Sequence, residues 1–124
     1  MNFLKELFSK KRVIDRSCKV TLSGRPPELS REAAAPAAID PVTGQHKDYW
    51  VLCEKEIAKG FVRPVRTKYV HKKCGVETSM GLKLAETYAV DPKFYAYTFC
   101  VHCKDHYPVS EFYWSDSPKE DVGS

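Results

Sequence analysis

Two short motifs decide the fold of this chain, His71-Lys-Lys-Cys74 and Cys100-Val-His-Cys103. Each motif sets two soft-metal ligands two intervening residues apart, and the stretch 75–99 between them is long enough for a helix and a returning strand. Zinc binds Cys thiolates and neutral imidazole in a tetrahedron, and ligand pairs with this spacing are typical of zinc sites. The sequence therefore predicts one structural zinc ion in a site of one histidine and three cysteines.

The residue after each motif bears on how well the motif can form a tight turn. Gly75 follows the first motif and can adopt a positive φ, as such a turn requires. Lys104 holds the equivalent place after the second, so we expect that turn to be less regular. The side chain of His102, inside the second turn, should point away from the metal.

Several alternatives to this ligand set remain at the level of sequence. One is a pair of buried thiols beside a surface histidine, and another is a redox-active dithiol at Cys100 and Cys103. A disulfide could join Cys103 to Cys100 or to Cys74. His102 or His106 could also take the place of His71 as a ligand.

Composition indicates one small domain with tails. The chain has 124 residues, 43% of them hydrophobic, with a net charge of +4 and a mean hydropathy of −0.44. The core is therefore modest, and a bound metal would compensate for its size. The mild positive charge permits contact with nucleic acid without requiring it.

Sequence features favour a cytoplasmic protein, in the host cytoplasm if the chain is phage-encoded. We find no signal-peptide pattern, and no apolar run approaches the roughly 20 residues of a membrane span. Reduced thiols fit such a compartment better than disulfides. Cys18 and Cys53 have no partner at metal-ligand spacing, so we expect them to be structural or free thiols.

The chain divides into four parts by composition. Residues 1–23 contain a predicted amphipathic helix over 2–10, with Phe3, Leu7 and Phe8 on its apolar face, followed by an edge strand within 17–23. Residues 24–47, rich in Pro, Gly and Ala, read as a linker. Residues 48–115 form the predicted zinc-binding domain, and 116–124 a polar tail. The helix could pack on its own domain, enter a partner's groove or lie on a membrane surface.

Within the zinc-binding domain, strands are predicted over 49–52, 61–70, 94–99 and 107–114. A short helix should follow Cys53, which stands at the N-cap, and a longer one should cover 80–89 after a cap at Thr78 or Ser79. The predicted fold class is a small α+β protein. It has a zinc-ribbon-like antiparallel sheet with one helix inserted between two zinc knuckles, plus the N-terminal helix and linker.

From residue 48 onward the chain resembles a family of small zinc-ribbon proteins encoded by phages and prophages. The matching segments are Lys59-Gly-Phe-Val-Arg-Pro-Val-Arg66, Tyr69-Val-His-Lys-Lys-Cys-Gly75, Ala85-Glu-Thr-Tyr-Ala89, Asp91-Pro-Lys-Phe-Tyr95, Thr98-Phe-Cys-Val-His-Cys103 and Glu111-Phe-Tyr-Trp114. The resemblance implies a metal site at His71, Cys74, Cys100 and Cys103, and the family pattern favours Ser where this chain has Cys53. It brings no established activity.

Three classes of function remain. The first is a non-enzymatic protein-interaction module acting on a host or phage partner, with the N-terminal helix as a tethered binding segment. The second is a nucleic-acid-binding zinc ribbon, in which aromatic residues and a basic strand contact the ligand. Its basic residues are Arg63, Arg66, Lys68, Lys72 and Lys73.

The third class is a nuclease or other zinc enzyme using Asp105, His102 and His106. Four good ligands leave no open position for catalysis, and we find no motif of an established enzyme class. We therefore expect a chain that is not an enzyme.

Overall fold

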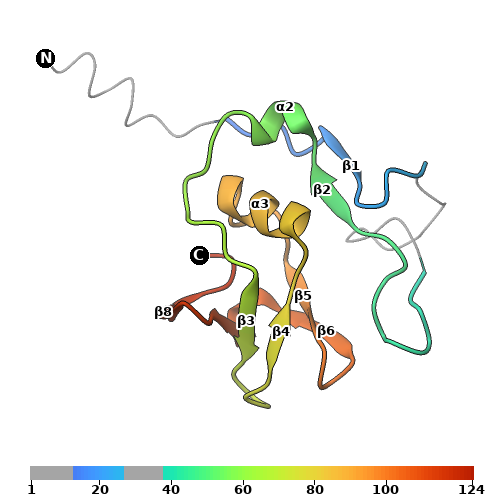
Figure 1. Cartoon of the computed structure of the whole chain (residues 1–124), viewed down its shortest axis with the longest axis vertical. Coiled ribbons are helices and arrows are strands. Elements are labelled where there is room, and N and C mark those ends of the chain that lie inside the picture. Colours follow the sequence, from blue (N-terminus) through green and yellow to red (C-terminus); the bar gives the residue numbers. More distant parts are fainter. Residues whose placement is uncertain (1–12, 27–37) are drawn as a thin grey trace, which may run out of the picture.

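The computed structural model describes residues 13–26 and 38–124. It is a small α+β protein built from short antiparallel sheets and two α-helices in these ranges (Figure 1). The predicted helix with Phe3, Leu7 and Phe8 lies outside the described residues. The elements are β1 (Lys19–Thr21), β2 (Trp50–Leu52), α2 (Glu54–Ile57), β3 (Lys68–His71), β4 (Glu77–Ser79), α3 (Leu82–Val90), β5 (Tyr97–Cys100), β6 (Asp105–Pro108), the 3-10 turn η1 (Val109–Glu111), β7 (Phe112–Trp114) and β8 (Ser117–Asp121).

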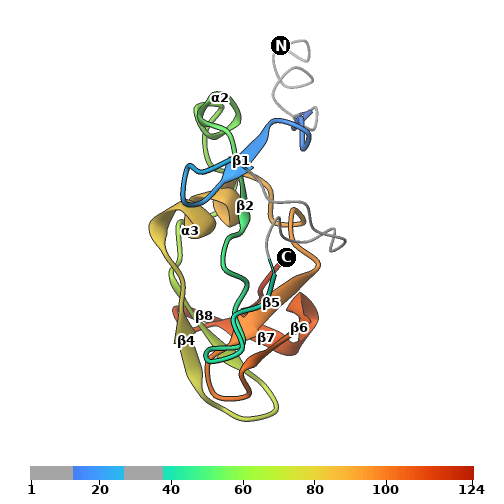
Figure 2. The same cartoon turned by 90° about the vertical axis from the view of Figure 1, so that its right-hand side faces the viewer.

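The largest sheet has the strand order β4-β3-β7-β8, and a separate hairpin pairs β5 with β6. Tyr69 on β3 lies opposite Thr78 on β4 and Trp114 on β7, so β3 is one of the two inner strands of this sheet. The turns of the β3–β4 and β5–β6 hairpins lie at the end of the molecule opposite α2 (Figures 1 and 2). This arrangement brings the two sequence motifs to the same end of the fold.

The strand predicted over 61–70 is much shorter in the structure. Only β3 is extended and paired, because Pro64 has no N–H to donate to a ladder. The backbone N–H groups of Val62 and Arg63 both donate to the carbonyl of Ala89, at 2.8 and 3.1 Å, instead of to a neighbouring strand. Residues 62 and 63 therefore lie against the end of α3.

The helix predicted over 80–89 is confirmed as α3, with its boundaries shifted by one or two residues. Gly81 stands at its N-cap, and neither Thr78 nor Ser79 caps it. Its buried side includes Ala85, Tyr88 and Ala89.

The C-terminal part contains more sheet than the sequence indicated. The strand predicted over 107–114 is divided by η1 into β6 and β7. The predicted polar tail is also wrong, because β8 pairs with β7 and Val122 is only 1% exposed. The Val122 N–H donates to the Phe112 carbonyl at 3.0 Å, so backbone pairing secures a segment whose composition is polar.

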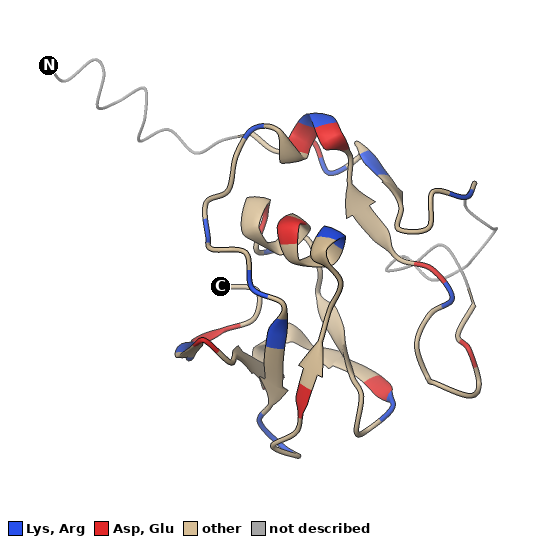
Figure 3. Ribbon diagram, viewed as in Figure 1, with Lys and Arg blue, Asp and Glu red and all other residues tan. Residues whose placement is uncertain are grey.

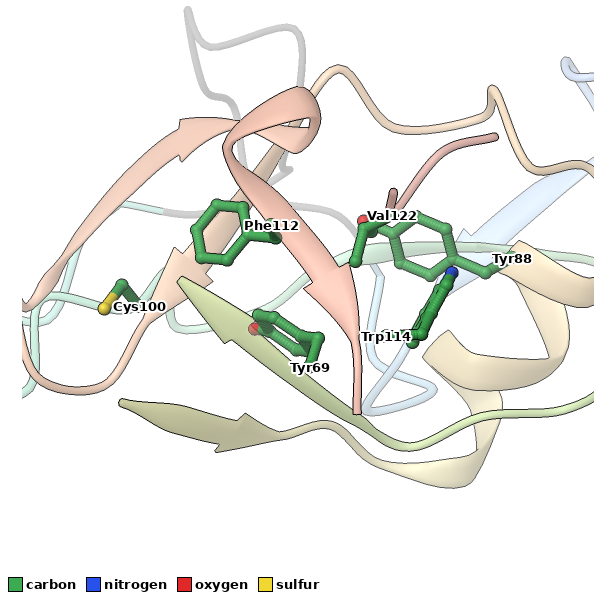
Figure 4. Packing of buried hydrophobic residues seen from close by; sticks show 6 residues of the cluster. All are labelled: Tyr69, Tyr88, Cys100, Phe112, Trp114 and Val122. Carbon is green, nitrogen blue, oxygen red and sulfur yellow. The ribbon is translucent and has the colours of Figure 1, made fainter. Parts of the chain in front are cut away.

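Aromatic residues dominate the core beneath these sheets (Figure 4). Edge-to-face contacts join Tyr69 to Phe112 and to Trp114, with ring centres 5.3 and 6.3 Å apart. Such pairs add specific geometry to the area they bury. The buried cluster comprises Tyr69, Tyr88, Cys100, Phe112, Trp114 and Val122. One of the motif cysteines is thus a member of the core.

A further two-stranded sheet, of β1 and β2, joins the N-terminal part to the rest. The edge strand expected in 17–23 is present as β1, which pairs antiparallel with β2. Cys18 and Cys53 form a disulfide, which corrects the expectation of reduced thiols at these positions. Cys53 is also the N-cap of α2, as predicted, but its side chain accepts no capping hydrogen bond from the first turn. The two cysteines are 35 residues apart in sequence, and only the β1–β2 pairing makes them neighbours.

Within the described ranges, no helix is long and apolar enough to cross a membrane.

Candidate metal centre

The first knuckle is the turn between β3 and β4. His71 ends β3, and the chain reverses so that the Gly75 N–H donates to the His71 carbonyl at 2.7 Å. Gly75 has a φ of +73°, as predicted for this position. The turn places Cys74 beside the strand that carries His71.

The second knuckle has the same geometry between β5 and β6. Cys100 ends β5, and the Lys104 N–H donates to its carbonyl at 2.8 Å. Lys104 has a φ of +57° and is the single residue other than glycine with a positive φ in the part of the chain that the structure describes. The second turn is therefore as regular as the first, contrary to our expectation, and Lys104 adopts a conformation that usually costs about 1–2 kcal/mol.

The four predicted ligands meet in one cluster. One ligand atom from each of His71, Cys74, Cys100 and Cys103 lies within 4.8 Å of the other three. Cys74 Sγ is 3.6 Å from Cys100 Sγ, and Cys103 Sγ is 3.6 Å from the Nδ1 of His71. All three cysteines are free, so neither disulfide considered above is present.

These spacings match a metal tetrahedron. Bonds of about 2.3 Å to sulfur and 2.0 Å to nitrogen give edges of about 3.8 Å between sulfurs and about 3.5 Å between sulfur and nitrogen. A disulfide would instead need sulfurs about 2.05 Å apart. The cluster could therefore hold a metal ion with only small adjustments.

The imidazole of His71 is fixed in the orientation that a ligand needs. Its Nδ1 faces Cys103, and its Nε2 lies 3.0 Å from the Oε1 of Glu111. The ring lies between Phe112, whose ring centre is 4.6 Å away and nearly parallel, and Tyr107 at 4.7 Å. A carboxylate that accepts the second N–H of a ligating histidine is the usual outer partner of such a site. Sequence reasoning missed Glu111, because it lies 40 residues from His71 and nothing in its spacing marks it.

The thiols differ in acidity. Burial opposes ionisation of Cys100, but hydrogen bonds from the Cys103 backbone N–H and from the Cys74 side chain lower the pKa of its thiol. Burial, together with the proximity of Cys100, raises the pKa of Cys103 to about 11. Ionisation of one thiol in the cluster thus makes ionisation of the next thiol less favourable. A bound cation would remove that opposition.

Other histidines near the second motif do not join the cluster. His102 is exposed within the turn. His106 points toward the β1–β2 side, where its Nε2 is 2.8 Å from the hydroxyl of Tyr49. Neither replaces His71 in the cluster.

The predicted basic strand is largely compensated by nearby acidic residues. Lys72 pairs with Asp121 at 2.8 Å, and Lys73 lies 3.4 Å from Glu111. Arg63 and Lys68 are exposed. Figure 3 shows that positive and negative residues are interspersed along the chain. Lys72 and Lys73 therefore lie within ion-pair distance of carboxylates, whereas no such pair involves Arg63 or Lys68 among the described residues.

Arg66 departs furthest from its predicted role as a surface contact. Its side chain is 4% exposed and lies 3.4 Å from Glu120. The guanidinium carbon is 4.6 Å from the centre of the Trp114 ring. It is a buried cation stacked on the core.

No protein-family model, curated protein or solved structure matches this chain.

Proposed function

We propose that the cluster binds one zinc ion with a structural role. On this proposal the chain is a non-enzymatic, phage-type zinc-ribbon protein that acts as an interaction module on a host or phage protein. The observation that carries the proposal is the set of four ligand atoms within 4.8 Å of one another, supplied by the tips of two hairpins.

Zinc is the metal that suits these donors best. Thiolate and imidazole ligands in a tetrahedron favour zinc over hard cations such as magnesium and calcium, which take oxygen ligands. The ion would be held by His71, Cys74, Cys100 and Cys103, with Glu111 accepting the remaining N–H of the imidazole.

A structural role follows from the number of ligands. Four protein ligands complete the tetrahedron, whereas a catalytic zinc keeps one position for water or substrate. The ion would join the β3–β4 hairpin to the β5–β6 hairpin and so hold together a fold whose sheets are short.

Zinc content measured by native mass spectrometry tests the metal assignment. The wild-type chain should retain one zinc ion, and His71→Ala and Cys100→Ser should each lose it. His102→Ala is the matched control, because His102 lies in the second turn without joining the cluster. A full zinc complement in Cys100→Ser, or loss of zinc in His102→Ala, would contradict the ligand set.

Two surface features support protein binding over nucleic-acid binding. Carboxylates compensate three of the five basic residues that a nucleic acid would contact, at Arg66, Lys72 and Lys73. Beside the end of α3, the consecutive apolar residues Phe61 and Val62 are 49% and 46% exposed. Exposed apolar side chains that are adjacent to one another are typical of interaction sites.

Affinity purification from infected host cells, with and without nuclease treatment, discriminates between these functions. For a protein partner we expect capture that resists nuclease. It should be lost when Phe3, Leu7 and Phe8 are changed to Ser, with zinc content unchanged. Unchanged capture by that variant would refute a role for the N-terminal segment.

The nucleic-acid alternative makes its own prediction. Salt-dependent binding of an oligonucleotide that disappears in Arg63→Gln/Lys68→Gln would support it. That result, together with capture that nuclease abolishes, would overturn the protein-interaction proposal.

A further inference from the structure

A cavity of about 560 Å³ opens between the β1–β2 sheet and the β5–β6 hairpin. It shares no residue with the metal cluster and is of a size typical of small-molecule sites. Most of its wall is aromatic. Its lining includes Trp50, Phe94, Tyr95 and Tyr97, with Arg16 and Lys19.

Two aromatic side chains at this cavity retain exposed surface. Trp50 on β2 is half-buried, and Tyr97 at the start of β5 is 53% exposed. The Tyr95 hydroxyl donates to the Trp50 carbonyl, which ties the strand of Trp50 to the segment before β5. This hydrogen bond holds the backbone that carries Trp50 close to the backbone that carries Tyr95. Flat aromatic rings at such a site favour a planar ligand that stacks on them.

Positive charge adjoins these rings. The Nζ of Lys19 lies 4.7 Å from the centre of the Trp50 ring, and none of the described carboxylates pairs with it. Arg16 donates to both carboxylate oxygens of Asp91, at 2.6 and 3.0 Å, while its side chain remains 57% exposed. Arg16 is therefore held in place at the rim, and Lys19 is available to an anion.

The lining also includes one carboxylate, that of Asp105. Its Oδ1 accepts the His106 N–H at 2.7 Å. This orients the carboxylate and leaves it able to accept a further hydrogen bond from an amino group.

We propose that this cavity binds a nucleotide. The base stacks on Trp50 and Tyr97, and the phosphate is met by Lys19 and Arg16. An uncharged apolar ligand would use the rings and leave the cations without a role, whereas an inorganic anion would use the cations and not the rings. A base that carries a phosphate uses both, as single-strand binding sites do.

The nucleotide could be free or part of a single strand, and an adjacent cavity bears on this point. A hollow of about 440 Å³ shares Tyr49, Tyr95 and Tyr97 with the first. The aromatic surface therefore continues beyond the space of one nucleotide. The site also differs from the basic strand, because Arg63, Arg66, Lys68, Lys72 and Lys73 line neither cavity.

Tryptophan fluorescence of the full chain tests the proposal. The chain has two tryptophans, and Trp114 is 2% exposed, so quenching by a stacked base reports on Trp50. Titration with adenosine 5′-monophosphate and, separately, with a ten-residue oligoadenylate should give saturable quenching. Binding of the monophosphate alone indicates a free nucleotide, and tighter binding of the oligomer indicates a single strand.

Matched variants separate this site from nonspecific attraction. Lys19→Gln should weaken binding roughly tenfold, because a charge-assisted hydrogen bond to phosphate is lost. Tyr97→Ala should weaken it by about fivefold or more through lost stacking. Lys55→Gln, on the exposed surface of α2, and Lys68→Gln, on β3, should bind as the wild type does.

The absence of quenching by both probes would overturn the proposal. Equal affinities of Lys19→Gln and Lys55→Gln would also overturn it. Zinc content and circular dichroism of each variant establish that the fold is intact, so that lost binding is a property of the site.

Discussion

At the residue scale, the candidate metal centre depends on how one imidazole is held. His71 is 1% exposed, lies between Phe112 and Tyr107, and has its Nε2 at hydrogen-bond distance from Glu111. These contacts orient Nδ1 toward the three sulfurs. Because the ring cannot turn without losing its packing, the ligand is arranged before any metal arrives, and binding requires less ordering.

Replacing Glu111 should weaken metal binding without removing the site. Glu111→Ala leaves the second N–H of His71 without its carboxylate, and we expect the metal dissociation constant to rise about 10- to 100-fold. Competition with a chromophoric chelator measures this change. Glu77→Ala is the control, because Glu77 lies exposed on β4 and bonds Ser115. Equal affinities of the two variants would show that the Glu111 carboxylate does not support the ligand.

Arg66 is a buried charge whose polar atoms are incompletely satisfied. Its Nε and Nη1 are buried without a hydrogen-bond partner. Arg66→Met keeps most of the volume over Trp114 and removes a buried charge, so the free energy of unfolding should stay within about 1 kcal/mol of wild type or increase. Arg66→Ala also loses the packing and should cost about 1–3 kcal/mol. Urea denaturation measures both. A larger loss in Arg66→Met than in Arg66→Ala would mean that the charge itself stabilises the fold.

At the element scale, the second knuckle is supported by a loop that precedes the domain. The segment 38–47 closes with an Ile39–His46 bridge and contains Gly44, which has a φ of +83°. A Cβ at Gly44 would lie 2.1 Å from the carbonyl oxygen of Lys104. This loop therefore packs directly against the backbone of the second knuckle, and part of the predicted linker belongs to the folded structure.

Gly44→Ala should accordingly destabilise the protein more than a positive φ alone explains. We expect a loss of about 2–4 kcal/mol in the free energy of unfolding. The added Cβ would overlap the Lys104 carbonyl, so the backbone must shift in addition to adopting an unfavourable φ. Gly24→Ala is the matched control. Gly24 also has a positive φ, of +80°, but no atom lies within 4 Å of its added Cβ. Its cost should be about 1–2 kcal/mol, and equal costs for the two variants would argue against close packing at Lys104.

At the scale of the whole molecule, different links secure the two ends. The metal cluster lies where the two hairpins turn, whereas the Cys18–Cys53 disulfide ties β1 to the start of α2 at the other end (Figure 1). Arg16 and Asp91 add an ion pair between the N-terminal part and the end of α3. A chain with a modest core thus has a covalent link as well as a candidate metal link.

Removing the disulfide should lower stability and leave the metal site occupied. For a 35-residue separation, the loop-closure model gives a loss of about 4 kcal/mol in the Cys18→Ser/Cys53→Ser variant. Urea denaturation under non-reducing conditions measures it, with zinc content determined in parallel. The wild type under reducing conditions should show a similar loss. Unchanged stability in the double variant would mean that the disulfide contributes little to the fold.

Local spacing determined much of the fold and the candidate site. Within one tight turn, a few consecutive residues determine the relative position of two ligands. The two motifs therefore predicted all four members of the cluster. The helix between them and the short strand at β1 also follow from patterns within a few residues.

Tertiary structure decided the features that join residues far apart in the sequence. The Cys18–Cys53 pairing, the contact of Glu111 with His71 and the burial of Arg66 each depend on which strands become neighbours. Backbone hydrogen bonds, which composition does not reveal, made β8 out of a polar segment. The aromatic cavity likewise has no signature in the sequence, because its rings come from separate elements that only packing brings together.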